Sequence, residues 1–261
     1  MKSAIIIPAL NEEDAIGQVV ANVRHKVDRV IVVDNGSTDR TAEIAANAGA
    51  EIATAYPPGY GRACLAGVAA ARDADLLIFM DGDGADDPSD LEALIDPILS
   101  RDADFVVGSR ALGVAERGAL TLPQRLGNAL AAGLMKLFWG GSFSDLGPFR
   151  AIERRAYNRL NMQAPTFGWT VEMQVRALKQ RLVCKEIPVN YRRRIGVSKI
   201  SGTIKGVILA GGYILGTIFK EAILSNRRPQ RLTSVSSSAV VVRAAPCSQS
   251  SLPRLCVAPE D

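Results

Sequence analysis

Short apolar runs alternate with helical patterns through the first part of the chain. The runs cover residues 4–8, 30–33, 52–55, 76–80 and 105–107, and each has the length of a strand. Apolar residues between them recur with helical spacing, for example at Ile16, Val19, Val20 and Val23. Continuous apolar strands separated by helices predict an α/β protein, with a mostly parallel, Rossmann-like sheet flanked by helices.

Polar residues indicate where several helices begin. We expect Asn11 to cap the first helix and Ser37 or Thr38 to cap the second. Asp87 and Pro88 suit the first turn of the helix after residue 86.

The pattern changes after residue 120. Helices are predicted around 123–138 and 168–180, an irregular segment at 144–150, and a strand-like stretch at 183–191. We interpret this half as the side that binds a second substrate, the acceptor. It is expected to pack on the same sheet, so that one domain spans residues 1–200.

Residues 201–225 form an apolar, glycine-rich segment. Its uninterrupted apolar part is shorter than the roughly 20 residues that a spanning helix needs. The segment therefore predicts an interfacial or packing helix, and contact with its own domain and contact with a membrane both remain open. Serine, proline and arginine dominate residues 226–261, which predicts a disordered tail.

Composition excludes several classes of protein. The net charge is only +4, and basic and aromatic residues do not interleave, so we expect no nucleic-acid partner. Four separated cysteines and the single histidine, His25, give no zinc pattern. The apolar N-terminal run is too short for a signal peptide, which predicts a cytoplasmic protein with reduced thiols.

Polar residues gather where the predicted strands end. They are Asn11-Glu12, Asp34-Asn35, Asp81-Gly82-Asp83 and Ser109-Arg110. Ligands of parallel α/β sheets bind outside the carboxyl ends of the strands, so these residues mark the candidate site.

Asp81 and Asp83 are the candidate metal ligands. Two carboxylates in a tight glycine-containing turn suit Mg²⁺ or Mn²⁺, whose remaining ligands would be diphosphate oxygens and water. Asp87 and Asp90, by contrast, fit the simpler role of capping the next helix.

Three further groups of residues are candidates for binding or chemistry. Those expected to bind a nucleotide-sugar are Pro8, Asn11, Glu12, Asp34, Asn35, Arg62 and Asp81. Those expected to bind an acceptor or its phosphate are Ser109, Arg110, Arg125, Arg150, Arg194 and Lys199. Asp145 and Glu172 are the candidate general bases, which a hydroxyl acceptor needs and an anionic phosphate does not.

These motifs together resemble glycosyltransferase family 2, closest to the branch of the dolichyl- and polyprenyl-phosphate sugar synthases. The resemblance rests on residues 5–12, 32–39 and 80–88 and on Gly108-Ser109-Arg110. It implies a GT-A fold, a UDP- or GDP-sugar donor, a divalent metal at Asp81 and Asp83, and transfer with inversion. It also implies that Arg110 and Lys199 meet a phosphate.

The chain departs from the family pattern at three places. Asn35 stands where many members have a second Asp, Ala85 where this branch often has Gln, and Gly147-Pro148 precedes Phe149. No paired transmembrane helices follow residue 200, unlike in many polyprenyl-phosphate enzymes.

Two acceptors remain open for the predicted hexosyltransferase. One is a polyprenyl phosphate, reached by peripheral contact with the inner face of the membrane, and the other is a small molecule or a protein. A sugar nucleotidyltransferase is disfavoured because Pro8 to Glu12 stand where a glycine- and arginine-rich phosphate loop is expected.

Overall fold

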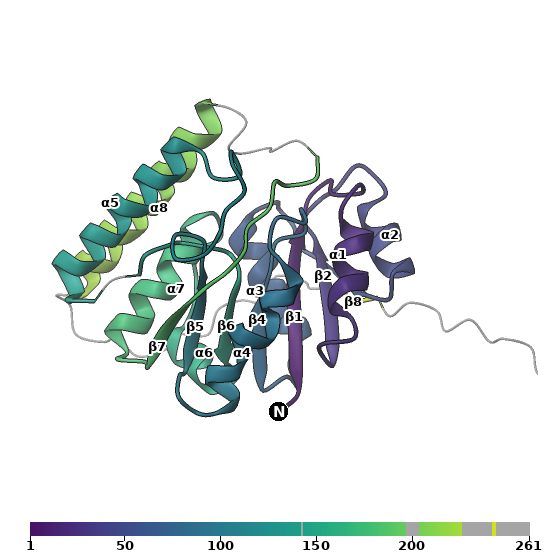
Figure 1. Ribbon diagram of the computed structural model, residues 1–261, viewed down its shortest axis with the longest axis horizontal. Coiled ribbons are helices and arrows are strands. Elements are labelled where there is room, and N and C mark those ends of the chain that lie inside the picture. Colours follow the sequence, from purple (N-terminus) through teal and green to yellow (C-terminus); the bar gives the residue numbers. More distant parts are fainter. Residues whose placement is uncertain (142, 197–203, 226–241, 244–261) are drawn as a thin grey trace, which may run out of the picture.

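The computed structural model describes residues 1–141, 143–196, 204–225 and 242–243 (Figure 1). The strands of these residues form one sheet in the order β7-β5-β6-β4-β1-β2-β3-β8. They are β1 (Ser3–Ala9), β2 (Arg29–Asp34), β3 (Glu51–Thr54), β4 (Leu76–Phe79), β5 (Phe105–Ser109), β6 (Arg150–Glu153), β7 (Cys184–Pro188) and β8 (Val242–Arg243).

The sheet is mostly parallel, as predicted. β1 pairs in parallel with β2 and β4, β2 with β3, and β5 with β7. The exceptions are β6, which runs antiparallel between β4 and β5, and the two-residue β8, which pairs antiparallel with β3. The sequence did not predict β6, which has only four residues and begins with a charged one, Arg150.

Helices cover both faces of the sheet (Figure 1). They are α1 (Ile16–Val23), α2 (Thr41–Asn47), α3 (Tyr60–Ala70), η1 (Pro88–Asp90), α4 (Leu91–Leu99), α5 (Leu122–Trp139), α6 (Arg154–Leu160), α7 (Gly168–Lys179) and α8 (Ile204–Ser225). One core cluster joins α1, α2 and α4 to the sheet, and the other joins α3, α6 and α7 to the opposite face, with buried residues from α5 and α8.

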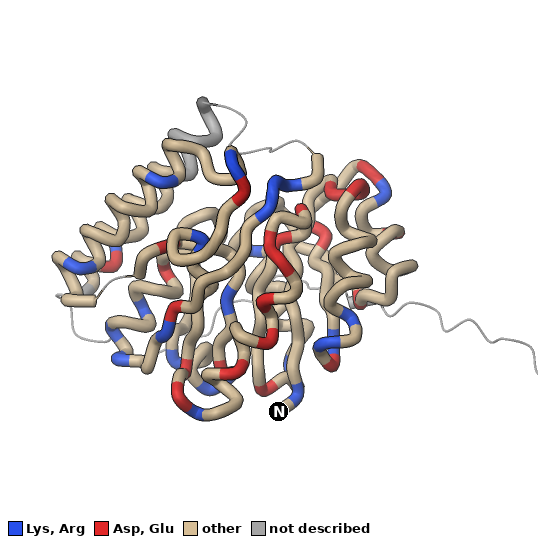
Figure 2. The backbone as a smooth tube through the Cα atoms, viewed as in Figure 1, with Lys and Arg blue, Asp and Glu red and all other residues tan. Residues whose placement is uncertain are grey.

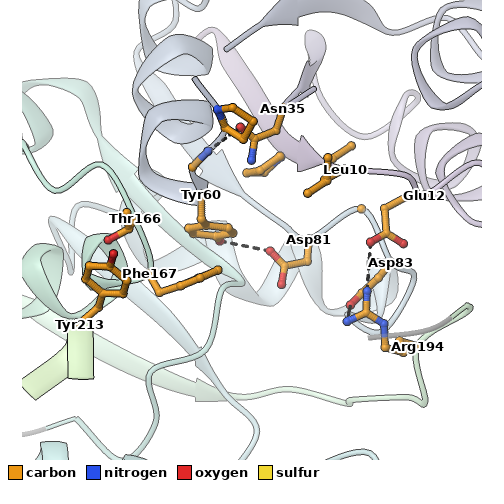
Figure 3. A pocket seen from close by; sticks show the side chains of 15 residues that line it. Leu10, Glu12, Asn35, Tyr60, Asp81, Asp83, Thr166, Phe167, Arg194 and Tyr213 are labelled. Atoms are coloured by element: carbon orange, nitrogen blue, oxygen red, sulfur yellow. Dashed lines mark hydrogen bonds and ion pairs between the residues drawn. The ribbon is translucent and has the colours of Figure 1, made fainter. Parts of the chain in front are cut away.

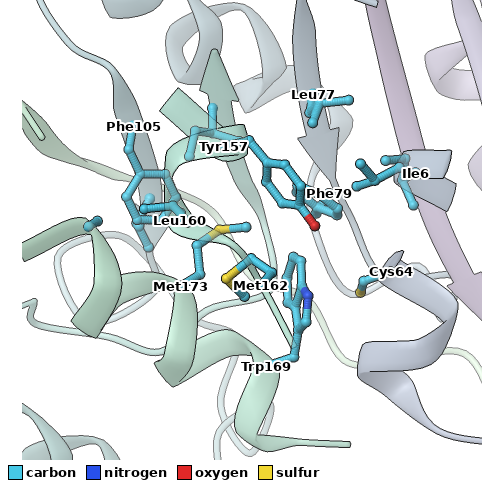
Figure 4. Packing of buried hydrophobic residues seen from close by; sticks show 14 of the residues in the cluster. Ile6, Cys64, Leu77, Phe79, Phe105, Tyr157, Leu160, Met162, Trp169 and Met173 are labelled. Carbon is cyan, nitrogen blue, oxygen red and sulfur yellow. The ribbon is translucent and has the colours of Figure 1, made fainter. Parts of the chain in front are cut away.

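The second cluster fixes the helices that carry the site (Figure 4). Trp169 of α7 is fully buried, and its ring lies 4.7 Å from that of Phe79 in β4. Gly67 lets α3 approach β1 closely, since a Cβ there would lie 2.3 Å from Ile6. The N-terminus of α3 and the start of α7 are thereby held at the same edge of the sheet.

Two predicted helix caps are wrong. α1 begins at Ile16 with no side-chain cap, and Asn11 instead adopts a left-handed backbone with φ of 51°. The Asn11 Oδ1 accepts a hydrogen bond from the Thr38 amide at 2.7 Å, which ties the loops after β1 and β2 together. α2 begins at Thr41, whose amide donates to the Asp39 carboxylate at 3.0 Å, so neither Ser37 nor Thr38 caps it.

The predicted cap at Asp87 is confirmed. The Asp87 side chain accepts from the Ser89 amide at 3.0 Å, and Pro88 follows in the first turn of η1.

α8 packs beside α5 and against α7 (Figure 1). Its Ile218 is fully buried, and its buried Glu221 forms ion pairs with Arg176 and Lys179 of α7 at 2.8 and 2.7 Å. None of the helices that the structure describes has both the length and the apolar content to cross a bilayer. The predicted tail lies outside the described residues except for β8, which pairs with β3.

We expect Glu221→Ala to loosen α8 without unfolding the sheet, because the partly buried Arg176 and Lys179 would both lose the buried carboxylate that ties α7 to α8. Removing one partner of a buried pair costs about 3 kcal/mol. In this variant, hydrogen–deuterium exchange should speed up in residues 211–224 and should change much less in β1 and β4. Glu92→Ala, which removes an exposed partner of Lys26, is the control, and unchanged protection of α8 in Glu221→Ala would contradict the prediction.

Candidate active site

The carboxyl ends of β1, β2 and β4 enclose a cavity of about 430 Å³ (Figure 3). Its walls include residues from the loops after these strands, the start of α3, the loop before α7, and α8. The lining residues are Pro8, Ala9, Leu10, Glu12, Asn35, Pro58, Gly59, Tyr60, Asp81, Gly82, Asp83, Thr166, Phe167, Arg194 and Tyr213. The cavity lies where the sequence places the candidate site.

Asp81 and Asp83 form an acidic turn at the floor of this cavity. Oδ1 of Asp81 accepts from the Tyr60 hydroxyl at 3.1 Å, and Oδ1 of Asp83 accepts from the Ala85 amide at 3.0 Å. Burial, and then the charge of Asp83, raise the pKa of Asp81 to about 7. The protein thus disfavours the charge of Asp81, and the neighbouring Asp83 contributes to this effect.

Asp86 adds a third acid beneath the turn. It is 2% exposed, its Oδ2 accepts from the Asp81 amide at 3.2 Å, and its Oδ1 has no hydrogen-bond partner. Burial and the charges of Asp81 and Asp83 raise the pKa of Asp86 well above its ordinary value. The sequence analysis missed Asp86, although its place three residues after Asp83 was a visible signal.

The guanidinium of Arg194 acts as a cation beside the turn (Figure 3). Its Nη1 lies 3.4 Å from Asp83 Oδ2, and its Nη2 lies 3.0 Å from Glu12 Oε1. The segment that carries it is fixed by hydrogen bonds from the Arg192 amide to Ala85 and from the Ile195 amide to Asp83. A positive charge therefore already occupies the corner between Glu12 and Asp83.

The turn fits a divalent metal that shares its shell with a phosphate ligand. Asp81 and Asp83 offer carboxylate oxygens, and the Arg194 guanidinium shows that a cation is accommodated next to them. Within the described ranges, no group of three or more His, Cys, Asp and Glu side chains is arranged to hold a metal without outside ligands. Magnesium and manganese suit such a site because they commonly keep water and phosphate oxygens in their shells.

The predicted nucleotide-binding residues are only partly brought together. Pro8, Glu12, Asn35 and Asp81 line the cavity, and Asn35 Oδ1 accepts from the Gly59 amide at 2.8 Å. The other three predicted residues are not among the lining residues, and their side chains hold local structure. Asn11 bonds to Thr38, Asp34 Oδ1 accepts from the Ser37 amide at 3.0 Å, and Arg62 donates to the Pro58 carbonyl at 3.1 Å.

A second cavity, of about 270 Å³, adjoins the first. The two share Tyr60, Asp81 and Phe167 as lining residues. The other residues that line the second cavity are Arg110, Pro123, Gln124, Gly127, Asn128, Leu146, Pro148, Thr170, Gly211 and Ile214. Asp81 therefore faces both spaces, and the second space is bounded by α5 and α8.

Arg110 lines the second cavity, and its side chain is held in place by Asp145 and Tyr191. Its Nε and Nη2 donate to the two oxygens of Asp145 at 2.7 and 2.8 Å, and its guanidinium lies 4.9 Å from the centre of the Tyr191 ring. Asn128 of α5 also donates to Asp145. Ser109, fully buried, hydrogen-bonds to Ser144 Oγ at 2.6 Å and so fixes the preceding position.

The structure does not support Asp145 as a general base. Burial opposes its ionisation, but hydrogen bonds and the charge of Arg110 outweigh that effect and lower its pKa below the ordinary 3.8. Both oxygens are engaged, so the carboxylate positions Arg110 instead.

Glu172 is also unsuited to the predicted role. Its Oε2 accepts from the amides of Gln163 and Ala164 at 3.0 and 2.8 Å, and its Oε1 pairs with Arg176 at 2.8 Å. Glu172 does not line either cavity. It stabilises the loop before α7, which carries Thr166 and Phe167.

The remaining predicted cations lie in different surroundings. Arg150 is fully buried and donates to the carbonyls of Leu146, Gly147 and Thr170. It does not line the second cavity itself but holds in place the backbone of Leu146 and Thr170, which do. Arg125 is exposed on α5 and lines neither cavity. Lys199 lies outside the described residues.

Several lining residues were not predicted from the sequence. Tyr60 stands between Gly59 and Gly61, and this pattern of small residues signals a close approach of backbone. A Cβ at Gly61 would lie 2.0 Å from the Ala164 carbonyl oxygen, which is why α3 can meet the loop before α7. Phe167 and Asn128 carry no comparable signal, because only the fold brings them near Asp81.

Comparison with known proteins agrees with this geometry. A model of Glycosyl transferase family 2 matches residues 4–161. An uncharacterized glycosyltransferase of Mycobacterium tuberculosis, Rv0539, is 34% identical over 209 residues, which are 79% of this chain and 93% of that protein. A dolichyl-phosphate hexose transferase of Haloferax volcanii is 31% identical over 86% of this chain and 95% of its own length.

A solved structure shares the fold. Glucosyl-3-phosphoglycerate synthase of Mycobacterium tuberculosis superposes with a TM-score of 0.68 over 85% of this chain and 80% of its own, at 23% identity. This likeness supports the predicted α/β fold of the GT-A type.

We expect Asp145→Asn to destabilise the protein by about 3 kcal/mol at pH 7, because Arg110 would keep its charge in a nearly buried site. The pKa of Asp145 is lowered on folding, so its stabilising effect is present above 3.8 and is lost as the pH falls below that value. Chemical denaturation of both proteins at pH 7 and at low pH tests this, since the difference should shrink in acid.

Glu43→Gln is the matched control, because it removes an ion pair with Arg40 that is exposed on both sides. It should change the free energy of unfolding far less than Asp145→Asn does, because solvent screens an exposed ion pair. Equal losses in the two variants would contradict a special role for the Arg110–Asp145 pair.

Proposed function

The chain belongs to glycosyltransferase family 2, and we propose that it transfers a sugar from a UDP- or GDP-sugar to a polyprenyl phosphate, with inversion and with Mg²⁺ or Mn²⁺. The observation that carries the proposal is the pair of adjoining cavities that share Asp81, Tyr60 and Phe167. The first holds the donor and the second the acceptor.

The first cavity has the features that a nucleotide-sugar requires. Asp81 and Asp83 would hold the metal, which when bound neutralises charge on the leaving diphosphate. Glu12 and Asn35 line the side away from the acceptor and supply polar groups for the nucleoside. Arg194, which is paired with Glu12 and Asp83, is placed to donate to diphosphate oxygens.

The acceptor residues favour a phosphate over a hydroxyl. Asp145 and Glu172 are held in ion pairs, so neither offers the general base that a hydroxyl acceptor needs. An ionised phosphate needs no base, and the guanidinium of Arg110 lines the cavity that we assign to it. A small-molecule or protein acceptor that reacts through a hydroxyl is therefore disfavoured.

The reaction joins the two cavities at Asp81. An oxygen of the acceptor phosphate forms a bond to the anomeric carbon while the bond from that carbon to the diphosphate breaks on the opposite side. The electron pair of the broken bond leaves with the nucleoside diphosphate, and the configuration is inverted. The dolichyl-phosphate hexose transferase relative supports this acceptor class, and the cytoplasmic, membrane-facing location stays a prediction.

Donor binding is tested by thermal shift with UDP-, GDP- and dTDP-sugars, each with and without Mn²⁺. We expect one nucleotide class to stabilise the fold with Mn²⁺, by about 2.7 kcal/mol at 100-fold excess over Kd. Asp83→Asn should lose this shift because it removes a metal ligand. Asp96→Asn, an exposed change on α4, should keep it, and a shift that survives Asp83→Asn would contradict the site.

Acceptor class is tested with a matched pair of lipids. Supplied with labelled donor, the enzyme should glycosylate a short-chain polyprenyl phosphate and leave the corresponding polyprenol unmodified, because only the phosphate is an anion at neutral pH. Transfer to the polyprenol at a comparable rate would contradict the phosphate acceptor and favour a hydroxyl one.

A further inference from the structure

Exposed apolar side chains are concentrated on α5 and α8. More than half of the exposed large apolar side chains of the described residues lie on these two helices, which run side by side at one end of the molecule (Figure 1). They are Leu122, Leu126, Leu130, Leu137 and Phe138 on α5, and Tyr213, Phe219, Ile223 and Leu224 on α8. Such a concentration marks an interaction surface rather than ordinary scattered exposure.

α5 presents an apolar stripe. Leu122, Leu126 and Leu130 follow one another at four-residue intervals and are 69%, 63% and 52% exposed. Residues four apart lie on the same side of a helix, so these leucines form a continuous outward face. The core needs only Ala131 and Met135 of this helix in fully buried positions.

The charges on this surface have one sign. Where the structure describes the side chains of α5 and α8, the exposed charged residues are Arg125, Lys136 and Lys220. The acid Glu221 is buried in its pairs with α7. Figure 2 shows the two helices mostly free of acidic residues. Exposed leucines flanked by cations complement an anionic lipid surface.

The second cavity reaches the surface at the same place. Pro123 and Gly127 line it and are themselves exposed, and they neighbour Leu122 and Leu126 in the chain. Ile214 lines it from α8. The space therefore extends from the apolar surface to Arg110 and Asp81.

We propose that α5 and α8 form a docking surface for an anionic lipid bilayer, which brings the mouth of the second cavity to the level of the lipid phosphates. The acceptor part of this inference rests on the proposed function. A second copy of the chain is a poorer occupant, because a two-fold contact would place this surface, whose described exposed charges are all positive, against a copy of itself.

Vesicle co-sedimentation tests the docking surface. The full chain should pellet with phosphatidylcholine vesicles that contain phosphatidylglycerol, and Leu126→Glu/Leu130→Glu should reduce this binding at least tenfold. The matched control is Leu99→Glu/Val183→Glu, which adds the same charges at apolar residues exposed elsewhere and should bind as the unchanged chain does. Replacing Arg125, Lys136 and Lys220 by Gln should weaken binding about fivefold for each cation.

Any of four results would overturn the proposal. The unchanged chain could fail to pellet with the vesicles, or the two double variants could bind the vesicles equally well. The chain could also form a dimer that does not bind vesicles and that Leu126→Glu/Leu130→Glu disrupts. Binding that appears only after removal of residues 226–261 would assign the surface to the chain's own C-terminal segment and would also overturn it.

The thermal shift with nucleotide-sugar and Mn²⁺, measured without vesicles, separates the two proposals. A retained shift without vesicle binding removes only the docking surface. Vesicle binding that depends on Leu126 and Leu130, in a chain without any nucleotide shift, supports the docking surface and contradicts the proposed function.

Discussion

The confinement of three carboxylates at the end of β4 is the constraint on which the site depends. Asp81, Asp83 and Asp86 lie within six residues, and both Asp83 and Asp86 are almost fully buried. Their charges repel one another in a medium that screens them poorly. Such an arrangement is stable only when protons or cations compensate it, and this need couples the local fold to ligand binding.

The three arginines around the site differ in how they relate to these carboxylates. Arg110 is already neutralised by Asp145, and Arg150 is buried among carbonyl groups that hold it in place. Of these three arginines, which all lie in the described part of the chain, Arg194 alone forms an ion pair with the acidic turn, and it shares its charge between Asp83 and Glu12. The cationic set of the sequence therefore separates into one positioning pair, one structural residue and one residue at the acidic turn.

The sequence predicted the fold well because its strands are both short and continuously apolar. Ile5 to Ile7, Val30 to Val33 and Leu77 to Phe79 are buried on both sides of the sheet, so their composition alone identifies central parallel strands. β6 escaped prediction because half of its four residues are charged, and its place in the sheet comes from pairing with β4 and β5. Asn11 failed as a cap because its side chain has a better partner in the next loop.

The site could be predicted from the sequence only where its functional residues lie close together at the end of one strand. Asp81 and Asp83 lie two residues apart in the sequence, and this spacing already implied a shared cation. Asp145 looked like a base because a sequence does not show that Arg110 lies against it. Phe167, Tyr213 and Asn128 reach the cavities through the packing of α7, α8 and α5, which no local pattern encodes.

Charge balance would link the binding of the proposed donor to that of the proposed metal. Among the described side chains, Arg194 pairs with Glu12 and Asp83, and the charge of Arg110 acts on Asp81 and Asp86 although Asp145 already pairs with it. The four acids of the site, Glu12, Asp81, Asp83 and Asp86, are therefore only partly compensated by these two guanidinium groups. A diphosphate would add negative charge to this imbalance and would be repelled unless a divalent cation entered with it. Asp81 and Asp83 would hold the metal, and Arg194, which pairs with Glu12 and Asp83, would supply a further positive charge to the diphosphate. The two ligands should therefore strengthen each other's binding, since each supplies the charge that the other lacks.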